Sequence, residues 1–290
     1  MAEVEAETEA RLASPTSPLV LTARPASLRV WWKGLWGARH VLATVARADF
    51  KVRYKRAAFG VAWAVAIPVL QATVLAVIFV RIIRFRDLPG GQPNDFGAYV
   101  ISGMLAWSYF AQTVPSASTA IVDGSGLTDK VWFPRAILPL APVLANLPGF
   151  LASLVVLVVA LPLLGSDLST RLLLLPVAAV ALCSFVAALG LVLSALQVYF
   201  RDTRFLVQAG LLLLFWLTPI AYPKSLLGGL APWLDANPMT GVVTLFRMST
   251  VGHELDWQRP VAVTVAATAL LLVIAAEAHR RHDRRFVDLL

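Results

Sequence analysis

The sequence predicts an all-α integral membrane protein with six transmembrane helices, preceded by an amphipathic helix that lies in the membrane interface. Of its 290 residues 58% are hydrophobic and only 14% are charged, and the mean hydropathy is +0.73. A soluble domain is about one quarter charged, and a chain this apolar lacks the polar side chains to cover a water-facing surface. The apolar residues also gather in stretches of roughly the 20 residues that a spanning helix needs.

The net charge and the cysteine count exclude further classes of protein. The formal net charge of +8 fits basic ends that face anionic lipid better than it fits a nucleic-acid-binding protein, because it accompanies apolar spans. Cys183 is the single cysteine, so the chain forms no disulfide within itself and no Cys-based zinc site.

The amino-terminal residues 1–27 are acidic and rich in proline, which is typical of a disordered tail. A signal peptide would need a basic start and an apolar core. We therefore expect the first membrane element to be retained.

Residues 28–50 form the predicted amphipathic helix. Trp31, Trp32 and Leu35 recur at helical spacing on one face, and basic residues such as Arg29 and Lys33 lie on the other. This pattern is typical of a helix in the plane of the membrane interface. The alternative is an amphipathic helix packed on a soluble domain, for which the chain leaves little material.

Residues 51–290 form the predicted six-helix transmembrane domain. Pro68 is expected to kink the first span. Residues 222–259 contain apolar patches too short to cross and are expected to form a re-entrant segment outside the cytoplasm. The predicted spans are residues 57–80, 98–122, 137–164, 172–198, 205–221 and 261–276.

Orientation follows from the positive-inside rule. With both termini cytoplasmic, 18 of the 25 Lys and Arg residues lie on the cytoplasmic side. The local exception is a group of three outer arginines, which either snorkel to lipid headgroups or meet an anionic substrate headgroup: Arg81, Arg84 and Arg86.

Catalytic and nucleotide-binding patterns are missing from the sequence. It contains no GxxxxGK[ST] loop, no HExxH and no pair of carboxylates placed for acid–base chemistry. The predicted spans also lack the ionisable residue that an ion-coupled transporter usually keeps at membrane depth. We therefore expect no enzyme activity, no metal and no cofactor, and a driving force that a partner ATPase supplies.

Four short segments, in order along the chain, carry a family resemblance. They are Asp49–Arg56 followed by Phe59, Gly60, Trp63 and Pro68; Lys130–Arg135 followed by Leu138–Leu140; Phe200–Asp202; and Pro219, Tyr222, Pro223, Asn237–Met239, Phe246 and Arg247. From residue 28 onward the chain resembles the membrane subunit of ABC-2 type exporters. The likeness is greatest to the bacterial branch that exports lipid-linked polysaccharides such as O-antigen, teichoic acid or capsule.

The resemblance implies a fold, partners and a location. It implies the ABC-2 exporter fold, a homodimer in a bacterial cytoplasmic membrane, and two copies of an ATPase subunit that bind the ATP and Mg²⁺. The substrate would be a lipid-linked glycan, with membrane lipid as a further partner and no nucleic acid. The alternatives are an ABC-2 exporter of drugs or simple lipids and an integral membrane enzyme acting on lipid-linked sugars.

The resemblance also assigns roles to residues. The ATPase would dock on a coupling segment, in which Trp132 and Phe133 are the expected anchors. Without the resemblance, an interfacial aromatic belt would explain the two rings equally well. The full set is Lys130, Val131, Trp132, Phe133, Pro134 and Arg135. A cytoplasmic gate would include Asp49, Lys51, Arg53, Tyr54, Lys55 and Arg56.

Aromatic rings can stack on the apolar faces of sugars without selecting one sugar. The candidates for such a channel lining, each of which also suits packing or a lipid-facing belt, are Trp107, Tyr109, Phe110, Phe215 and Trp216. At least two of the five are expected to face the pore.

Overall fold

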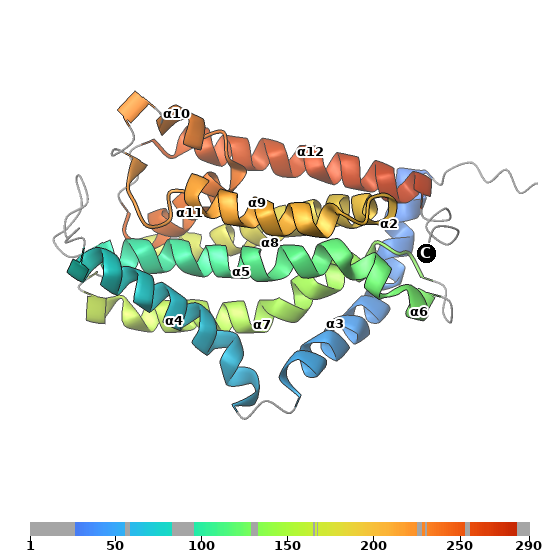
Figure 1. Cartoon of the computed structure of the whole chain (residues 1–290), viewed down its shortest axis with the longest axis horizontal. Coiled ribbons are helices and arrows are strands. Elements are labelled where there is room, and N and C mark those ends of the chain that lie inside the picture. Colours follow the sequence, from blue (N-terminus) through green and yellow to red (C-terminus); the bar gives the residue numbers. More distant parts are fainter. Residues whose placement is uncertain are drawn as a thin grey trace, which may run out of the picture.

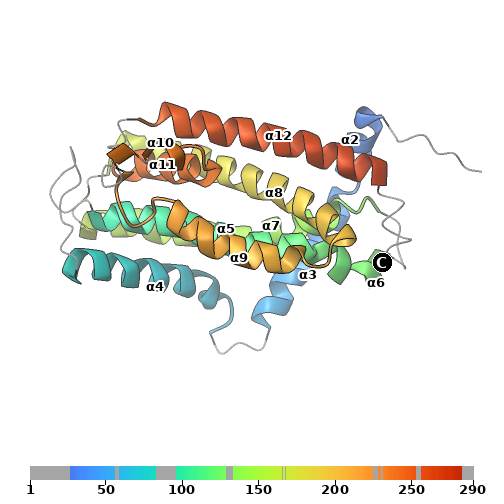
Figure 2. The same cartoon turned by 45° about the horizontal axis from the view of Figure 1, so that its top comes forward.

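A computed structural model describes residues 27–55, 59–82, 96–128, 133–164, 166, 168–224, 228–229, 231–252 and 256–282. Within these residues the chain is helical and contains no strand. The long helices run side by side in one bundle (Figure 1). One end of the bundle carries α2, α3 and α6, and the opposite end carries α10 and α11; we call them the α3 end and the α11 end (Figures 1 and 2).

Two helices replace the single amphipathic helix that the sequence predicts. These are α2 (Leu28–Gly37) and α3 (Arg39–Tyr54). The Ser27 side chain caps α2 by accepting a hydrogen bond from the Val30 amide. The chain turns at Ala38, so the two helices point in different directions (Figure 1). The rest of the predicted tail lies outside the described residues.

The face of α2 toward the bundle is protein-packed. Trp31 is buried against Ala136 and Leu191, whereas Trp32 and Trp36 remain exposed. The amino-terminal helices therefore lie against the bundle and still present large apolar rings outward.

The long helices α4, α5, α7, α8, α9 and α12 follow the predicted spans, and the further helices α6, α10 and α11 lie between them. They are α4 (Trp63–Val77, after a 3-10 turn Gly60–Ala62 and before a π-helical turn Ile78–Ile82), α5 (Phe96–Asp123), α6 (Ser125–Thr128), α7 (Ile137–Ala160), α8 (Leu175–Tyr199, after a 3-10 turn Thr170–Leu174), α9 (Thr203–Leu217), α10 (Ala231–Leu234), α11 (Pro238–Thr250) and α12 (Gln258–His282).

Four of these segments are long and apolar enough to cross a membrane, namely residues 60–77, 137–160, 170–199 and 258–281. The two other predicted spans differ for separate reasons. Helix α5 has 28 residues but carries several Ser, Thr and Gln side chains. Helix α9 is apolar but has only 15 residues, because it stops at Thr218, before Pro219, where the α conformation is disfavoured.

Helix α5 lies at the centre of the fold. It packs against α4, α7, α8, α9 and α11, and most of its side chains are buried. Small residues allow close approach: a Cβ added to Gly190 of α8 would lie 2.7 Å from the Ala117 Cβ of α5, and one added to Gly149 of α7 would lie 2.7 Å from the Ala64 Cβ of α4.

The predicted re-entrant segment contains one substantial helix, α11. Asn237 caps it by accepting from the Met239 amide, and Pro238 occupies its first turn. Gly241 brings α11 against α12, since a Cβ there would lie 2.1 Å from the Pro260 carbonyl oxygen. Nearly all of α11 is buried, so it is part of the bundle core.

Candidate functional site

Polar side chains recur every three or four residues along α5 and so share one side of the helix. We call this set the polar face of α5: Ser108, Gln112, Ser116, Thr119 and Asp123. Gln112, in the middle part of the helix, is exposed, and Ser116 and Thr119 are half-buried. If α5 crosses the membrane as the sequence predicts, this exposed amide needs water, a ligand or another protein chain, because lipid offers it no hydrogen bond.

A cavity of about 380 Å³ lies where the polar face of α5 reaches the α3 end. Helix α3 contributes Asp49 and Arg53, α5 contributes Ser116, Thr119 and Asp123, and α7 contributes apolar side chains. Its volume falls in the range of about 300–1,000 Å³ that small-molecule sites occupy.

Arg53 is held in place by both neighbouring helices. Its Nε and Nη2 donate to the two Asp49 carboxylate oxygens at 3.1 and 3.0 Å, and its Nη1 donates to Asn146 Oδ1 at 3.0 Å. Asn146 is buried in α7 and donates in turn to the Thr113 hydroxyl of α5 at 3.0 Å. This Arg53–Asn146 network joins α3, α5 and α7 beside the cavity.

The polar face continues beyond this network into the bundle. A narrow hollow there is lined by Gln112, Asn146, Ser153 and Tyr109, among others. Further along, the Ser108 hydroxyl donates to the Gln71 side chain of α4 at 3.4 Å. Polar side chains of α4, α5 and α7 therefore form a row from the α3 end toward the middle of the fold.

The predicted gate residues divide into two groups. Asp49 and Arg53 line the cavity and pair with each other. Lys51 and Lys55 are exposed. The side chain of Tyr54 and the whole of Arg56 lie outside the described residues.

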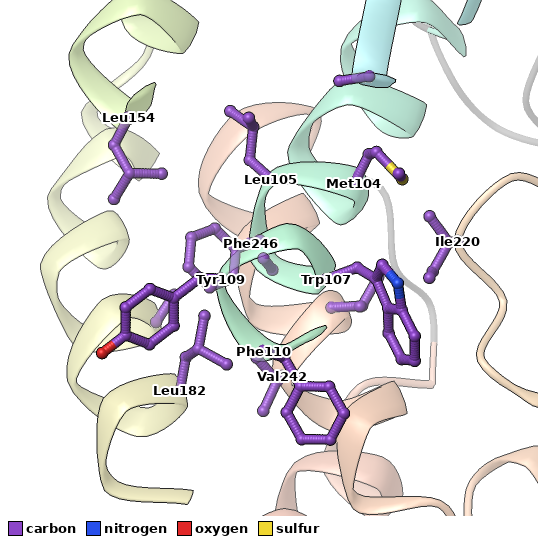
Figure 3. Close-up of a cluster of buried hydrophobic side chains, with 14 of the residues drawn as sticks. Met104, Leu105, Trp107, Tyr109, Phe110, Leu154, Leu182, Ile220, Val242 and Phe246 are labelled. Carbon is purple, nitrogen blue, oxygen red and sulfur yellow. The ribbon is translucent and has the colours of Figure 1, made fainter. Parts of the chain in front are cut away.

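Three of the predicted channel aromatics are packed inside the bundle. Trp107, Tyr109 and Phe110 are all buried, and Figure 3 shows them among Leu154, Leu182 and Val242. Tyr109 donates to the Val143 carbonyl at 2.8 Å, and Phe110 stacks on Phe185. These rings have no free face for a sugar in this conformation, because neighbouring helices already cover them.

The other two aromatics lie on α9. Phe215 packs edge-on against Trp107, with ring centroids 5.4 Å apart. Trp216 is 65% exposed, so of the five candidates it offers the most open ring.

The predicted coupling segment is described only in its second half. Phe133 is 5% exposed and packs with Ile121, Ile137 and Val198, and Pro134 and Arg135 are also buried. Phe133 is therefore a core residue of the bundle in this structure, and its ring is not presented to a partner. Lys130, Val131 and Trp132 lie outside the described residues.

At the α11 end, Arg247 is almost fully buried. Its Nη2 donates to the carbonyls of Pro219 and Ile220, and its guanidinium carbon lies 3.4 Å from the centroid of the Tyr99 ring. Tyr99 donates to the Tyr222 carbonyl at 3.2 Å. Arg247 and Tyr99 thus hold the non-helical segment after α9 against α5 and α11.

Sequence reasoning missed Gln112, Thr113 and Asn146, and it also missed the cavity residues Ser116, Thr119 and Asp123. The signal for Gln112 was available, since polar residues at positions 108, 112, 116 and 119 share a helical face. Asn146 sits in a long apolar run of α7 with no such pattern around it, and only tertiary structure shows that it meets Arg53.

Four helices that are long and apolar enough to cross a membrane define the class of the protein within the described residues: a helical membrane protein. Comparison with known proteins gives the family. The family model described as "ABC-2 type transporter" matches residues 40–250, and the chain therefore belongs to the ABC-2 type transporter family, as its resemblance indicates.

Curated relatives extend the match over nearly the whole chain. An O-antigen export system permease protein RfbA of Myxococcus xanthus is 28% identical over 88% of this chain and 96% of that protein. An O-antigen export system permease protein RfbA of Klebsiella pneumoniae is 25% identical over 86% of this chain and 95% of its own length.

Proposed function

We propose that this chain is the membrane permease of an ATP-driven exporter that moves a lipid-linked polysaccharide across the cytoplasmic membrane. The observation that carries the proposal is the similarity to O-antigen export permeases over 86–88% of the chain. The polar face of α5 supports it, because a hydroxyl-rich chain needs hydrogen-bonding groups along its path. The same similarity favours a polysaccharide over a drug or a simple lipid.

The α3 end faces the cytoplasm in this proposal, with both termini inside and α11 at the outer mouth. The protein then has six spans if α5 and α9 are added to the four apolar ones. The polar side chains of α5 and the short length of α9 suit positions next to a hydrated path rather than full contact with lipid.

The working unit is a homodimer with two ATPase subunits. A single copy leaves apolar side chains of α4 and α9 exposed, including Leu70, Val74, Leu212 and Leu213. Lipid or a second copy of the chain must cover them. We place the translocation path between the two copies, with Gln112 and Trp216 toward it.

The ATPase subunit docks at the α3 end in this proposal and binds the ATP and Mg²⁺. Because Phe133 is buried, the docking contacts fall on the residues before it, with Trp132 as the anchor. Motion of this segment would reach α5 through α6 and reach α3 through the Arg53–Asn146 network.

Deletion of the gene tests the function. Surface polysaccharide should disappear and its lipid-linked precursor should accumulate in the cytoplasmic leaflet, and a plasmid copy should restore export. Co-purification with the ATPase subunit gives a second readout, since ATP hydrolysis should require that subunit. Unchanged surface polysaccharide in the deletion strain would rule the function out.

A further inference from the structure

The cavity at the α3 end has a composition that the export function alone does not explain. Its polar lining consists of two carboxylates, one guanidinium and two hydroxyls, from Asp49, Asp123, Arg53, Ser116 and Thr119. The rest of the lining is apolar and consists mostly of small side chains.

This mixture fits a neutral polyol better than a phosphate group. Two carboxylates against one guanidinium give the lining a negative formal charge, which disfavours an anion. Carboxylates accept hydrogen bonds from hydroxyl groups, while a guanidinium and hydroxyl side chains can donate to ring and hydroxyl oxygens. A sugar offers donors and acceptors of both kinds.

The guanidinium of Arg53, the charged donor in this cavity, is already oriented without a ligand. Asp49 and Asn146 engage three of the five N–H groups of Arg53. The guanidinium plane is therefore fixed between α3 and α7, so a ligand need not immobilise it. The side-chain exposures of 23% for Arg53 and 30% for Asp49 leave both groups accessible.

The cavity also shares residues with the polar face of α5, which leads from it into the bundle. Ser116 and Thr119 belong to the polar face of α5, and Gln112, one turn further into the bundle, is exposed on the same face. A chain held in the cavity can extend from there along the polar face.

From this geometry we propose that the α3–α5–α7 cavity binds a neutral sugar segment of the lipid-linked polysaccharide at the cytoplasmic mouth. Asp49 and Asp123 accept from sugar hydroxyls, and Arg53 and Thr119 donate. The inference rests on the proposed function and adds to it the place and chemistry of recognition before transport.

A cysteine placed in the cavity tests occupancy without knowledge of the sugar. Cys183 is the single cysteine, so Cys183→Ser gives a background for Thr119→Cys, and both variants are first checked for export. The rate of maleimide labelling is measured in inside-out vesicles that contain the whole transporter. The vesicles come from cells that make the glycan and from cells in which its first glycosyltransferase is deleted.

We expect glycan to slow labelling of Thr119→Cys at least about fivefold. The matched control is Thr44→Cys, an exposed position of α3 outside the cavity lining, which should label equally in both preparations. Equal labelling of Thr119→Cys with and without glycan overturns the site. Absence of labelling in both also overturns it, because protein then fills the cavity.

A second variant tests the binding site independently of the proposed export function. Thr119→Val should raise the concentration of glycolipid extract that half-maximally stimulates the transporter's ATP hydrolysis by about three- to tenfold, as expected for one lost hydrogen bond. Thr44→Val should leave it unchanged. An unchanged half-maximal concentration in Thr119→Val removes the site while the export function stands; failure of the function appears instead as normal surface polysaccharide after gene deletion.

Discussion

Replacement of Arg247 by methionine tests the role of the buried arginine at the α11 end. Methionine keeps much of the length and apolar contact of the side chain but removes the donor to the Pro219 and Ile220 carbonyls and the cation above the Tyr99 ring. Replacing a buried charge by an apolar residue can be neutral when all its partners leave with it. Here both carbonyls stay behind without that donor.

The expected loss can be worked from these contacts. Each buried carbonyl left without a partner costs about 1–3 kcal/mol, and a desolvated cation–π contact contributes about 2 kcal/mol. For two carbonyls and the cation–π contact together, we expect Arg247→Met to lower the free energy of unfolding by about 4–8 kcal/mol. At roughly 2–4 °C per kcal/mol for a chain of this size, the Tm should fall by about 10 °C or more.

The measurement is thermal unfolding of the purified permease in detergent, followed by fluorescence-detected size exclusion. Arg259→Met is the matched control, because Arg259 is exposed in the first turn of α12 and surface changes stay within about 0.5 kcal/mol. Arg247→Lys should fall between the two, since lysine keeps the charge but not the planar stack. Equal Tm values for Arg247→Met and Arg259→Met would refute the reasoning.

Three further changes probe other contacts. Gly241→Ala places a Cβ 2.1 Å from the Pro260 carbonyl oxygen, so the folded yield should drop, whereas Gly126→Ala, with open space around it, should not change the yield. Asn146→Leu removes the partner of Arg53 and of the Thr113 hydroxyl. This loss should lower the Tm by the equivalent of about 2–4 kcal/mol and reduce surface polysaccharide. A normal Tm and normal surface polysaccharide would show that the network is dispensable. Phe133→Ala removes a buried ring and should lower the free energy of unfolding by about 3–5 kcal/mol. Trp132→Ala should instead reduce co-purification of the ATPase subunit at unchanged Tm. The reverse result would mean that the ATPase subunit contacts Phe133.

Continuous apolar runs were the most predictable part of the fold. The stretches predicted at 137–164 and 172–198 correspond to α7 and to α8 with its preceding turn, within a few residues at most ends. Long runs of Leu, Val and Ala leave the chain no other way to satisfy its backbone hydrogen bonds in an apolar environment.

The break between α2 and α3 and the burial of the aromatic rings depend on tertiary contacts, and the hydropathy pattern did not predict them. The turn at Ala38 interrupts a helical spacing that is regular on both sides of it. Trp107 and Phe110 have the composition of channel residues but are covered by Phe215 and Phe185. Which face of α5 is covered depends on five neighbouring helices, and local sequence does not encode their positions.

Of the charged residues that line the cavity, the sequence indicated Asp49 and Arg53 but not Asp123, and it indicated none of the neutral polar ones. Asp49 and Arg53 carry a local signal, being four residues apart on one helix. Asn146 contributes through a contact 93 positions away in the chain, which composition cannot reveal.

In the proposed orientation, the short length of α9 connects opening of the outer mouth with entry of water. Its 15 residues span about 22 Å, less than the roughly 30 Å of hydrocarbon in a bilayer. In the proposed six-span arrangement, the peptide groups that follow α9 therefore lie within the thickness of the membrane, where Arg247 and Tyr99 donate to the Ile220 and Tyr222 carbonyls. In that arrangement, a movement of α11 away from this segment would remove the Arg247 donor, and water would have to replace it. Opening of the proposed outer mouth would then require water to enter it.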